Sequence, residues 1–179
     1  MADARATWRP PFTSVSVTAW PGEADALAAR VQAAFGLTLP PPGRWTAEAG
    51  LVAVWLGPEQ WQVEHDDRPD LAASLAAAIG PHGGVIDVSD ARAVLRLSGP
   101  GSREVLARLL PLDLHPRAFA PGSAANSLAA HLSVQLRQID EVPSYELGCL
   151  RGYADSLAHA VTEAGAALTL PPRQAAGLG

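Results

Sequence analysis

Lysine is absent from the 179-residue sequence, in which all thirteen basic residues are arginine. This absence excludes a Walker A loop, a Schiff-base lysine and a pyridoxal-phosphate anchor, because each of these needs a lysine amine. Cys149 is the single cysteine, which excludes an internal disulfide, a CxxC redox pair and a thiolate zinc site. The sequence contains no GxSxG or GxGxxG motif and no HExxH pair of histidines. Few of the sequence motifs that identify common catalytic sites are therefore left.

Long apolar runs and basic blocks are also missing. No stretch approaches the roughly 18 apolar residues that a membrane span requires, and the N-terminal residues lack the apolar segment of a signal peptide. The net charge is −5, which argues against a nucleic-acid or anionic membrane surface as a partner. We therefore expect a cytoplasmic protein whose partners are proteins or small molecules.

What the sequence does contain is an ordered series of periodic segments. "FTSVSVTAW" alternates like a strand, and the next segment places Leu27, Val31 and Phe35 on one helix face, with Pro21 in the first turn and Gly36 at the end. Two strands, "LVAVWL" and "WQVEH", follow a proline-rich break. A second helix, with Asp67 as a possible cap and apolar residues four apart, leads to the buried strand "GGVIDV".

The same order recurs downstream. "AVLRLSGPGSREVLARLLPL" repeats strand, turn and helix, "HLSVQLRQ" and "SYELGCL" repeat the strand pair, and a helix with Tyr153, Leu157 and Val161 on one face precedes "AALTL". The predicted class is α+β, with two pseudo-repeated βαββαβ halves whose mainly antiparallel sheets are covered by helices. The predicted boundaries are a tail over 1–12, halves over 13–88 and 89–170, and a tail over 171–179. Neither half promises much core of its own, so we expect the two to pack together.

Three features could carry chemistry, and each also has a structural explanation. The Gly99-Pro100-Gly101 turn could present backbone N–H groups to an anion, or it could simply start a helix capped by Ser98 or Ser102. The helix start is favoured, because Glu104 in the first turn already complements the helix dipole. Asp87, Ser89 and Asp90 follow a buried strand and are candidates for acid–base chemistry. Cys149 is predicted to be a small buried residue on a strand.

The segments "WLGPEQWQV", "VIDVSDARAVLRLSGPGSREVLARLLPLDLHPRAF" and "YADSLAHAV" resemble the gamma subunit of heterotetrameric sarcosine oxidase, over about residues 13 to 170. The "DVS…LRLSGP" part also resembles the fold of the glycine-cleavage aminomethyltransferase, or T-protein. The resemblance implies a role in the oxidative demethylation of sarcosine to glycine, with the one-carbon unit passed to tetrahydrofolate. It implies a gamma chain that is structural, catalyses nothing itself and holds no cofactor or metal.

The resemblance also implies partners and cofactors on other chains. The alpha subunit would carry NAD and the folate site, the beta subunit FAD and the amine substrate, and an FMN would lie between them. The small delta subunit would bind zinc. T-protein acids tied to folate chemistry lie in a hairpin of the second half, whereas the corresponding residues 131–138 contain no Asp or Glu. Folate-dependent catalysis by this chain is therefore not expected.

The candidate subunit interface is the "LHPRAF" corner together with a tryptophan of the N-terminal segment: Trp8, His115, Pro116, Arg117 and Phe119. The corner could instead be an intrachain turn or a ligand site, because it joins a histidine, a common acid–base residue, to a guanidinium that can hold an anion. Two other functions stay open at this point. One is a freestanding folate-binding protein that uses a pocket between the halves. The other is the equivalent subunit of a related N-methyl amino acid dehydrogenase.

Overall fold

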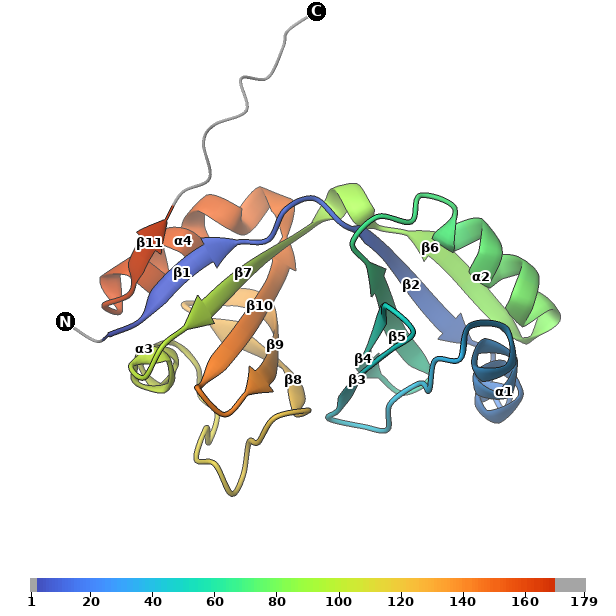
Figure 1. Ribbon diagram of the computed structural model, residues 1–179, viewed down its shortest axis with the longest axis horizontal. Coiled ribbons are helices and arrows are strands. Elements are labelled where there is room, and N and C mark those ends of the chain that lie inside the picture. The colour runs from blue at the N-terminus through green and yellow to red at the C-terminus, as the bar shows by residue number, and fades with distance from the viewer. Residues whose placement is uncertain (1–2, 170–179) are drawn as a thin grey trace, which may run out of the picture.

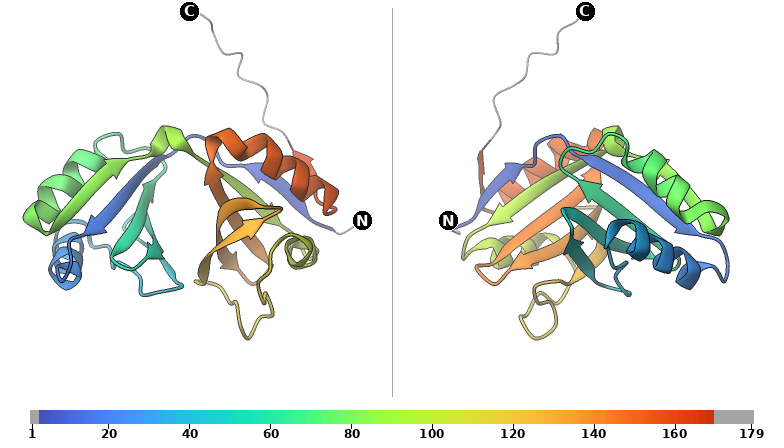
Figure 2. Two further views of the ribbon diagram at one scale, coloured as in Figure 1. Left: turned by 180° about the vertical axis from the view of Figure 1, so that it is seen from behind. Right: turned by 45° about the vertical axis from the view of Figure 1, so that its right-hand side comes forward.

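The computed structural model describes residues 3–169, which form two β-sheets placed side by side with helices on their outer sides (Figures 1 and 2). The chain crosses between the sheets twice, once through residues 9–12 and once through the short helix η2 (Ser89–Ala91). The predicted division between residues 88 and 89 falls at this second crossing. The predicted C-terminal tail, 171–179, lies outside the described residues.

The first half forms a five-stranded sheet in the order β3-β4-β5-β2-β6, with every neighbouring pair antiparallel. Its elements are β2 (Thr13–Ala19), α1 (Ala24–Phe35), β3 (Trp45–Glu48), β4 (Leu51–Gly57), β5 (Gln60–His65), α2 (Leu71–Ile79), η1 (Gly80–His82) and β6 (Gly83–Asp87). The predicted α+β class with mainly antiparallel sheets is confirmed.

The second half repeats this order. Its elements are β7 (Arg92–Ser98), α3 (Ser102–Leu109), β8 (Ala124–Ala129), β9 (Leu132–Asp140), β10 (Ser144–Leu150), η3 (Arg151–Tyr153), α4 (Ala154–Glu163) and β11 (Ala167–Thr169). Each half has one strand more than the predicted βαββαβ plan, because β3 and β8 were not expected. Both are edge strands, and edge strands need less buried apolar surface than central ones.

The N-terminal segment differs from the predicted tail over 1–12. Residues Arg5–Trp8 form strand β1, which inserts into the second sheet and completes the order β11-β1-β7-β10-β9-β8. β1 lies antiparallel to β7 and parallel to β11, so it takes the place beside β7 that β6 takes beside β2. Ala4 and Ala6 belong to the apolar core of this half and are almost completely buried.

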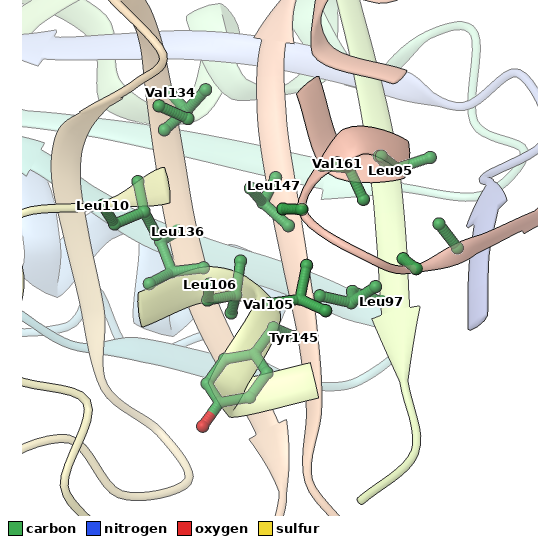
Figure 3. Close-up of a cluster of buried hydrophobic side chains, with 14 of the residues drawn as sticks. Leu95, Leu97, Val105, Leu106, Leu110, Val134, Leu136, Tyr145, Leu147 and Val161 are labelled. Carbon is green, nitrogen blue, oxygen red and sulfur yellow. The ribbon is translucent and has the colours of Figure 1, made fainter. Parts of the chain in front are cut away.

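Each half has a large apolar core of its own, which corrects the expectation that neither would have much of one. In the first half, Val15, Trp61 and Val63 of the sheet pack against α1 and α2, whose Leu27, Val31, Leu71, Leu75 and Ile79 are buried as their spacing predicts. In the second half, β7, β9 and β10 pack against α3 and α4 (Figure 3). Its buried side chains include Leu95, Leu97, Val105, Leu106, Leu136, Tyr145, Leu147, Leu157 and Val161.

The helix ends differ from the predictions in three places. Gly36 ends α1 in the left-handed conformation (φ 64°), as expected, but Pro21 lies in the turn before the helix. The residue that precedes α2 is Asp70, not Asp67, and its Oδ2 accepts a hydrogen bond from Ser74 Oγ at 2.8 Å. Tyr153 lies in η3 with 47% of its surface exposed, because α4 starts one residue later than the apolar spacing suggested.

Candidate functional site

The faces that the two sheets turn toward each other are polar, because alternate residues of each strand point away from the helices. On β5, Trp61 and Val63 belong to the apolar core, whereas Gln62 and Glu64 point to the other side and are also buried. On β2, the core residues Val15 and Val17 alternate with Ser14 and Ser16 in the same way.

The second sheet presents a matching polar face. On β9, Val134 and Leu136 belong to the core and alternate with the buried Gln135 and Arg137. On β10, Glu146 is the polar neighbour of Tyr145 and Leu147, and on β7 Arg92 and Arg96 share this face. The space between the sheets therefore holds a buried layer of charged and amide side chains, which we call the inter-sheet layer: Arg9, Gln62, Glu64, Arg92, Gln135, Arg137 and Glu146.

Arg137 is the centre of an ion-pair network in this layer. Its Nη2 donates to Glu64 Oε2 across the two halves at 2.9 Å, and also to Glu146 Oε2, which its Nε contacts at 2.8 Å. Arg9 adds a second cation, since its Nη1 lies 2.7 Å from Glu64 Oε2 and 3.7 Å from Glu146 Oε2. Every one of these side chains is at least 85% buried.

The network extends through amides to Arg92. Gln62 Nε2 donates to Glu64 Oε1 at 2.7 Å, and Gln62 Oε1 accepts from Arg92 Nη2 at 2.8 Å. The chain of contacts therefore runs from Glu146 through Arg137, Glu64 and Gln62 to Arg92, and it joins three strands of the second sheet to β5 of the first.

Charge pairing outweighs burial in the centre of the network. Burial alone would raise the pKa of Glu64, but the guanidinium groups of Arg137 and Arg9 hold it below its ordinary value. Burial would lower the pKa of Arg137, but Glu64 and Glu146 raise it overall. Glu64 and Arg137 are therefore both charged at neutral pH, and both carboxylates of the network pair with arginine.

Backbone contacts close the layer at one edge. Ala124 N donates to Gly43 O at 2.8 Å and Trp45 N donates to Gly122 O at 3.0 Å. Trp45 Nε1 also donates to Gln138 O at 2.8 Å, and its ring lies 5.6 Å from the Arg137 guanidinium. These bonds fix β3 of the first half against β8 and β9 of the second.

Two pockets open from the inter-sheet layer. One has a volume of about 240 Å³ and is lined by residues of both sheets, among them Ser16, Leu56, Arg92, Gln135 and Leu150. The other, of about 410 Å³, lies beside Arg9, Asp66, Arg96 and Glu146. Among residues 3–169, no three His, Cys, Asp or Glu side chains come close enough together to hold a metal ion. No helix within that range is long and apolar enough to cross a bilayer.

The Gly99-Pro100-Gly101 turn leads from β7 into α3, as the helix-start interpretation predicted. Gly101 N donates to Asp3 O at 2.9 Å and Ser102 N donates to Gly99 O at 3.0 Å, so these amides already have acceptors. No side chain caps α3, which corrects the predicted role of Ser98 or Ser102. Glu104 pairs instead with Arg108 one turn later, at 2.5 Å.

The other residues that were candidates for chemistry, Asp87, Asp90 and Cys149, have structural roles. Asp87 is exposed, and hydrogen bonds from the Ser89 hydroxyl and N–H lower its pKa. Asp90 is exposed beside it, and its carbonyl accepts from Arg151 Nε at 2.6 Å. Cys149 is a fully buried core residue on β10, as predicted, and burial raises the pKa of its thiol. A thiol in this setting is a poor nucleophile.

The five predicted interface residues do not form one surface. His115, Pro116 and Arg117 are exposed in the loop after α3, where His115 Nδ1 accepts from Arg117 N at 3.2 Å. Phe119 is only 8% exposed and belongs to the apolar core of the second half. Trp8 is half-buried on β1 and packs against the same core.

The inter-sheet layer itself was not predicted. Glu64 and Arg137 lie 73 residues apart in the sequence, and each reads as the polar position of an alternating strand. One signal was available: Gln135 and Arg137 on β9 have the same spacing as Gln62 and Glu64 on β5, and Arg137 and Glu64 carry opposite charges.

A family model described as "Sarcosine oxidase, gamma subunit family" matches residues 21–167 of this chain. Among curated proteins, the sarcosine oxidase subunit gamma of Arthrobacter sp. is 40% identical over 138 residues, which cover 75% of this chain and 67% of that protein. The subunit gamma of Corynebacterium sp. strain P-1 is 38% identical over the same coverage.

Solved structures agree with these relatives. A chain of the heterotetrameric sarcosine oxidase from Corynebacterium sp. U-96 superposes with a TM-score of 0.81 at 30% identity, over 90% of this chain and 83% of that chain. The glycine cleavage system aminomethyltransferase T from Bartonella henselae superposes with a TM-score of 0.63 at 18% identity, over 94% of this chain and 48% of that chain. The second similarity concerns the fold alone.

Proposed function

The chain belongs to the sarcosine oxidase gamma subunit family and is a subunit of an oxidoreductase complex. We propose that it acts within this complex as a structural subunit that catalyses nothing itself. The observation that carries this proposal is the inter-sheet layer. Its two buried carboxylates, Glu64 and Glu146, are both paired with Arg137, so they serve to join the two halves and are not turned toward a substrate.

A brace between larger subunits needs fixed geometry, and the layer supplies it. Ion pairs and backbone hydrogen bonds fix the orientation of the two halves, whereas a purely apolar interface would let one half shift against the other. The cores of the two halves are separate, so their relative orientation depends on the layer. A rigid pair of sheets can then hold neighbouring subunits at a set distance from each other.

The proposed partners are the alpha, beta and delta subunits, with alpha and beta in direct contact. The exposed corner of His115, Pro116 and Arg117 is the proposed contact, and the half-buried Trp8 on β1 is a separate candidate contact. Phe119 supports the corner from inside the core, so a partner would not reach its side chain.

Cofactors are proposed to lie on the other subunits: NAD, FAD, FMN and the folate site on alpha and beta, and zinc on delta. The residues of this chain do not favour a folate site of their own. β9 faces the inter-sheet layer with Gln135 and Arg137 in place of acids. A cytoplasmic location stays a prediction.

Co-expression with the alpha, beta and delta subunits tests the assembly. The wild-type chain is expected to co-purify with them, and Arg117→Ala is expected to weaken the complex while its own melting temperature stays unchanged. Arg30→Ala is the matched control, since Arg30 is an exposed arginine on α1 in the other half. Equal co-purification of the two variants would exclude the corner as a contact, and failure of the wild-type chain to co-purify would refute the structural role.

The isolated chain gives a second test. It is expected to show no flavin absorbance, no sarcosine oxidation and no heat of binding with tetrahydrofolate. Micromolar binding of tetrahydrofolate by the isolated chain would instead favour the freestanding folate-binding protein.

A further inference from the structure

The inter-sheet layer has one more positive than negative charge. It contains the guanidinium groups of Arg9, Arg92 and Arg137, but only the buried carboxylates of Glu64 and Glu146. Asp66 also contacts Arg9, but its side chain is 91% exposed, so water screens that pair. One of the three arginines therefore lacks a buried carboxylate to balance its charge.

Arg92 is that surplus cation. Arg9 and Arg137 both contact carboxylates, whereas the one side-chain partner of Arg92 within residues 3–169 is the neutral amide of Gln62. Burial lowers the pKa of Arg92 more than the charge of Glu64 raises it, which fits a guanidinium without a direct counter-ion. Arginine nevertheless stays charged at neutral pH, so the position attracts an anion.

The pocket of about 240 Å³ lies at this unpaired charge. Arg92 Nε is buried and has no acceptor, and neither has Nε2 of Gln135, a side chain that is 93% buried and lines the same pocket. Buried N–H donors without acceptors are unfavourable. Both of these donors belong to side chains that line the one pocket, and the positive charge of Arg92 beside them favours a ligand that carries a negative charge.

The remaining lining residues narrow the class of ligand. Leu56, Val88 and Leu150 give the pocket an apolar side, and Ser16 and Ser133 add two hydroxyls. A single guanidinium, with Nη2 already bonded to Gln62, can still use Nε and the second hydrogen of Nη2 for the two oxygens of a carboxylate. A phosphate or sulfate dianion would have only one cation to meet it.

The pocket is open to solvent on one side, because the lining residues Asn126, Ser133 and Leu150 are exposed. Its inner part is formed by the buried Gln62, Gln135 and Gly148. From this arrangement we infer that the pocket at Arg92 and Gln135 is a binding site for a small monocarboxylate with a short aliphatic body. The site is independent of the proposed assembly role, because it lies wholly within this chain.

The test uses the full-length ¹⁵N-labelled chain and propionate as the probe, with propionamide as the uncharged control of the same shape. Propionate is expected to cause saturable NMR shifts at the Gln135 side-chain amide and at Arg92 Nε–H, and propionamide to cause none. Arg92→Gln is expected to weaken propionate binding by at least about tenfold. Arg96→Gln, the same change at an exposed arginine of the same strand that does not line this pocket, is expected to leave binding unchanged.

A second variant guards against loss of folding in Arg92→Gln. Gln135→Glu places a carboxylate in the pocket, so it is expected to abolish propionate binding while the chain stays folded. Absence of saturable shifts, equal shifts with propionamide, or unchanged propionate binding by Arg92→Gln or by folded Gln135→Glu would each overturn the inference. Assembly is measured separately by co-purification, so the two proposals can fail independently.

Discussion

Arg137→Met is the substitution that tests the inter-sheet layer most directly. It removes the cation that joins Glu64 of the first half to Glu146 of the second, and methionine can fill much of the space left by the aliphatic part of the arginine. Glu64 then keeps only Arg9 as a charged partner, and the two carboxylates share it.

The size of the effect follows from what is left behind. A close pair of opposite charges gains about 4 kcal/mol at the effective dielectric constant of a protein, and most of this gain is offset by the cost of taking both ions out of water. Removing only the cation leaves the carboxylates with that cost and without the gain, which amounts to about 3–5 kcal/mol. Total stabilities are about 5–15 kcal/mol, so the variant should be close to unfolding.

Urea unfolding followed by tryptophan fluorescence measures the loss, and Trp45 beside Arg137 reports on the layer. Arg108→Met is the matched control, because Arg108 pairs with Glu104 on the surface of α3 with both side chains more than half exposed. Such a pair contributes at most about 1 kcal/mol. If Arg137→Met cost no more than Arg108→Met, the buried network would not hold the halves together and the reasoning would be refuted.

Three further predictions concern single groups. The pKa of Glu64 is lowered in the folded chain, so the stability that its ionised form contributes is present above its ordinary pKa of 4.5 and is lost as the pH falls through the folded pKa. Glu64→Gln should therefore reduce the loss of stability at acid pH, measured by urea unfolding at several pH values. An unchanged loss of stability at acid pH would contradict the assignment. Ser89→Ala should raise the pKa of Asp87 toward 3.8, measured by NMR titration, whereas Ser156→Ala should not. Gly99→Ala should lower the free energy of unfolding by about 1–3 kcal/mol, because φ is +110° and the new Cβ would lie 2.6 Å from Asp3 O. Gly122→Ala is the control, because φ there is also positive but a Cβ would have free space, and it should lower the free energy of unfolding clearly less. Equal losses of stability would mean that the Asp3 contact is unimportant.

The helices and central strands could be predicted because their apolar residues repeat at a fixed spacing. Leu71, Leu75 and Ile79 point to one side of α2 and are all buried, as a helical period requires. β1 could not be predicted in this way, since its partners β7 and β11 lie far away in the sequence. The alanines of β1 are also weak indicators of a strand.

The site was less predictable than the fold. Gln62 and Glu64 have the same alternation as the outer residues of a solvent-exposed sheet face, and periodicity alone cannot tell water from a second polar sheet. What buries them is the face of β9 and β10, which comes into contact only when both halves are folded. The Gly99-Pro100-Gly101 turn is by contrast explained by its contacts with the backbone of Asp3.

The polar inter-sheet layer also offers a reason why the sequences of the two halves differ on their inner faces. In each half the helices cover the outer face of the sheet and supply its apolar core, so the inner faces are free to differ. The first half contributes the buried carboxylate Glu64 there and the second the buried arginine Arg137, so this ion pair joins unlike halves. Two copies of the first half would instead bring two Glu64 carboxylates together without Arg137. The same divergence leaves Arg92 without a carboxylate of its own, which places the unpaired charge at the pocket and not in the centre of the brace.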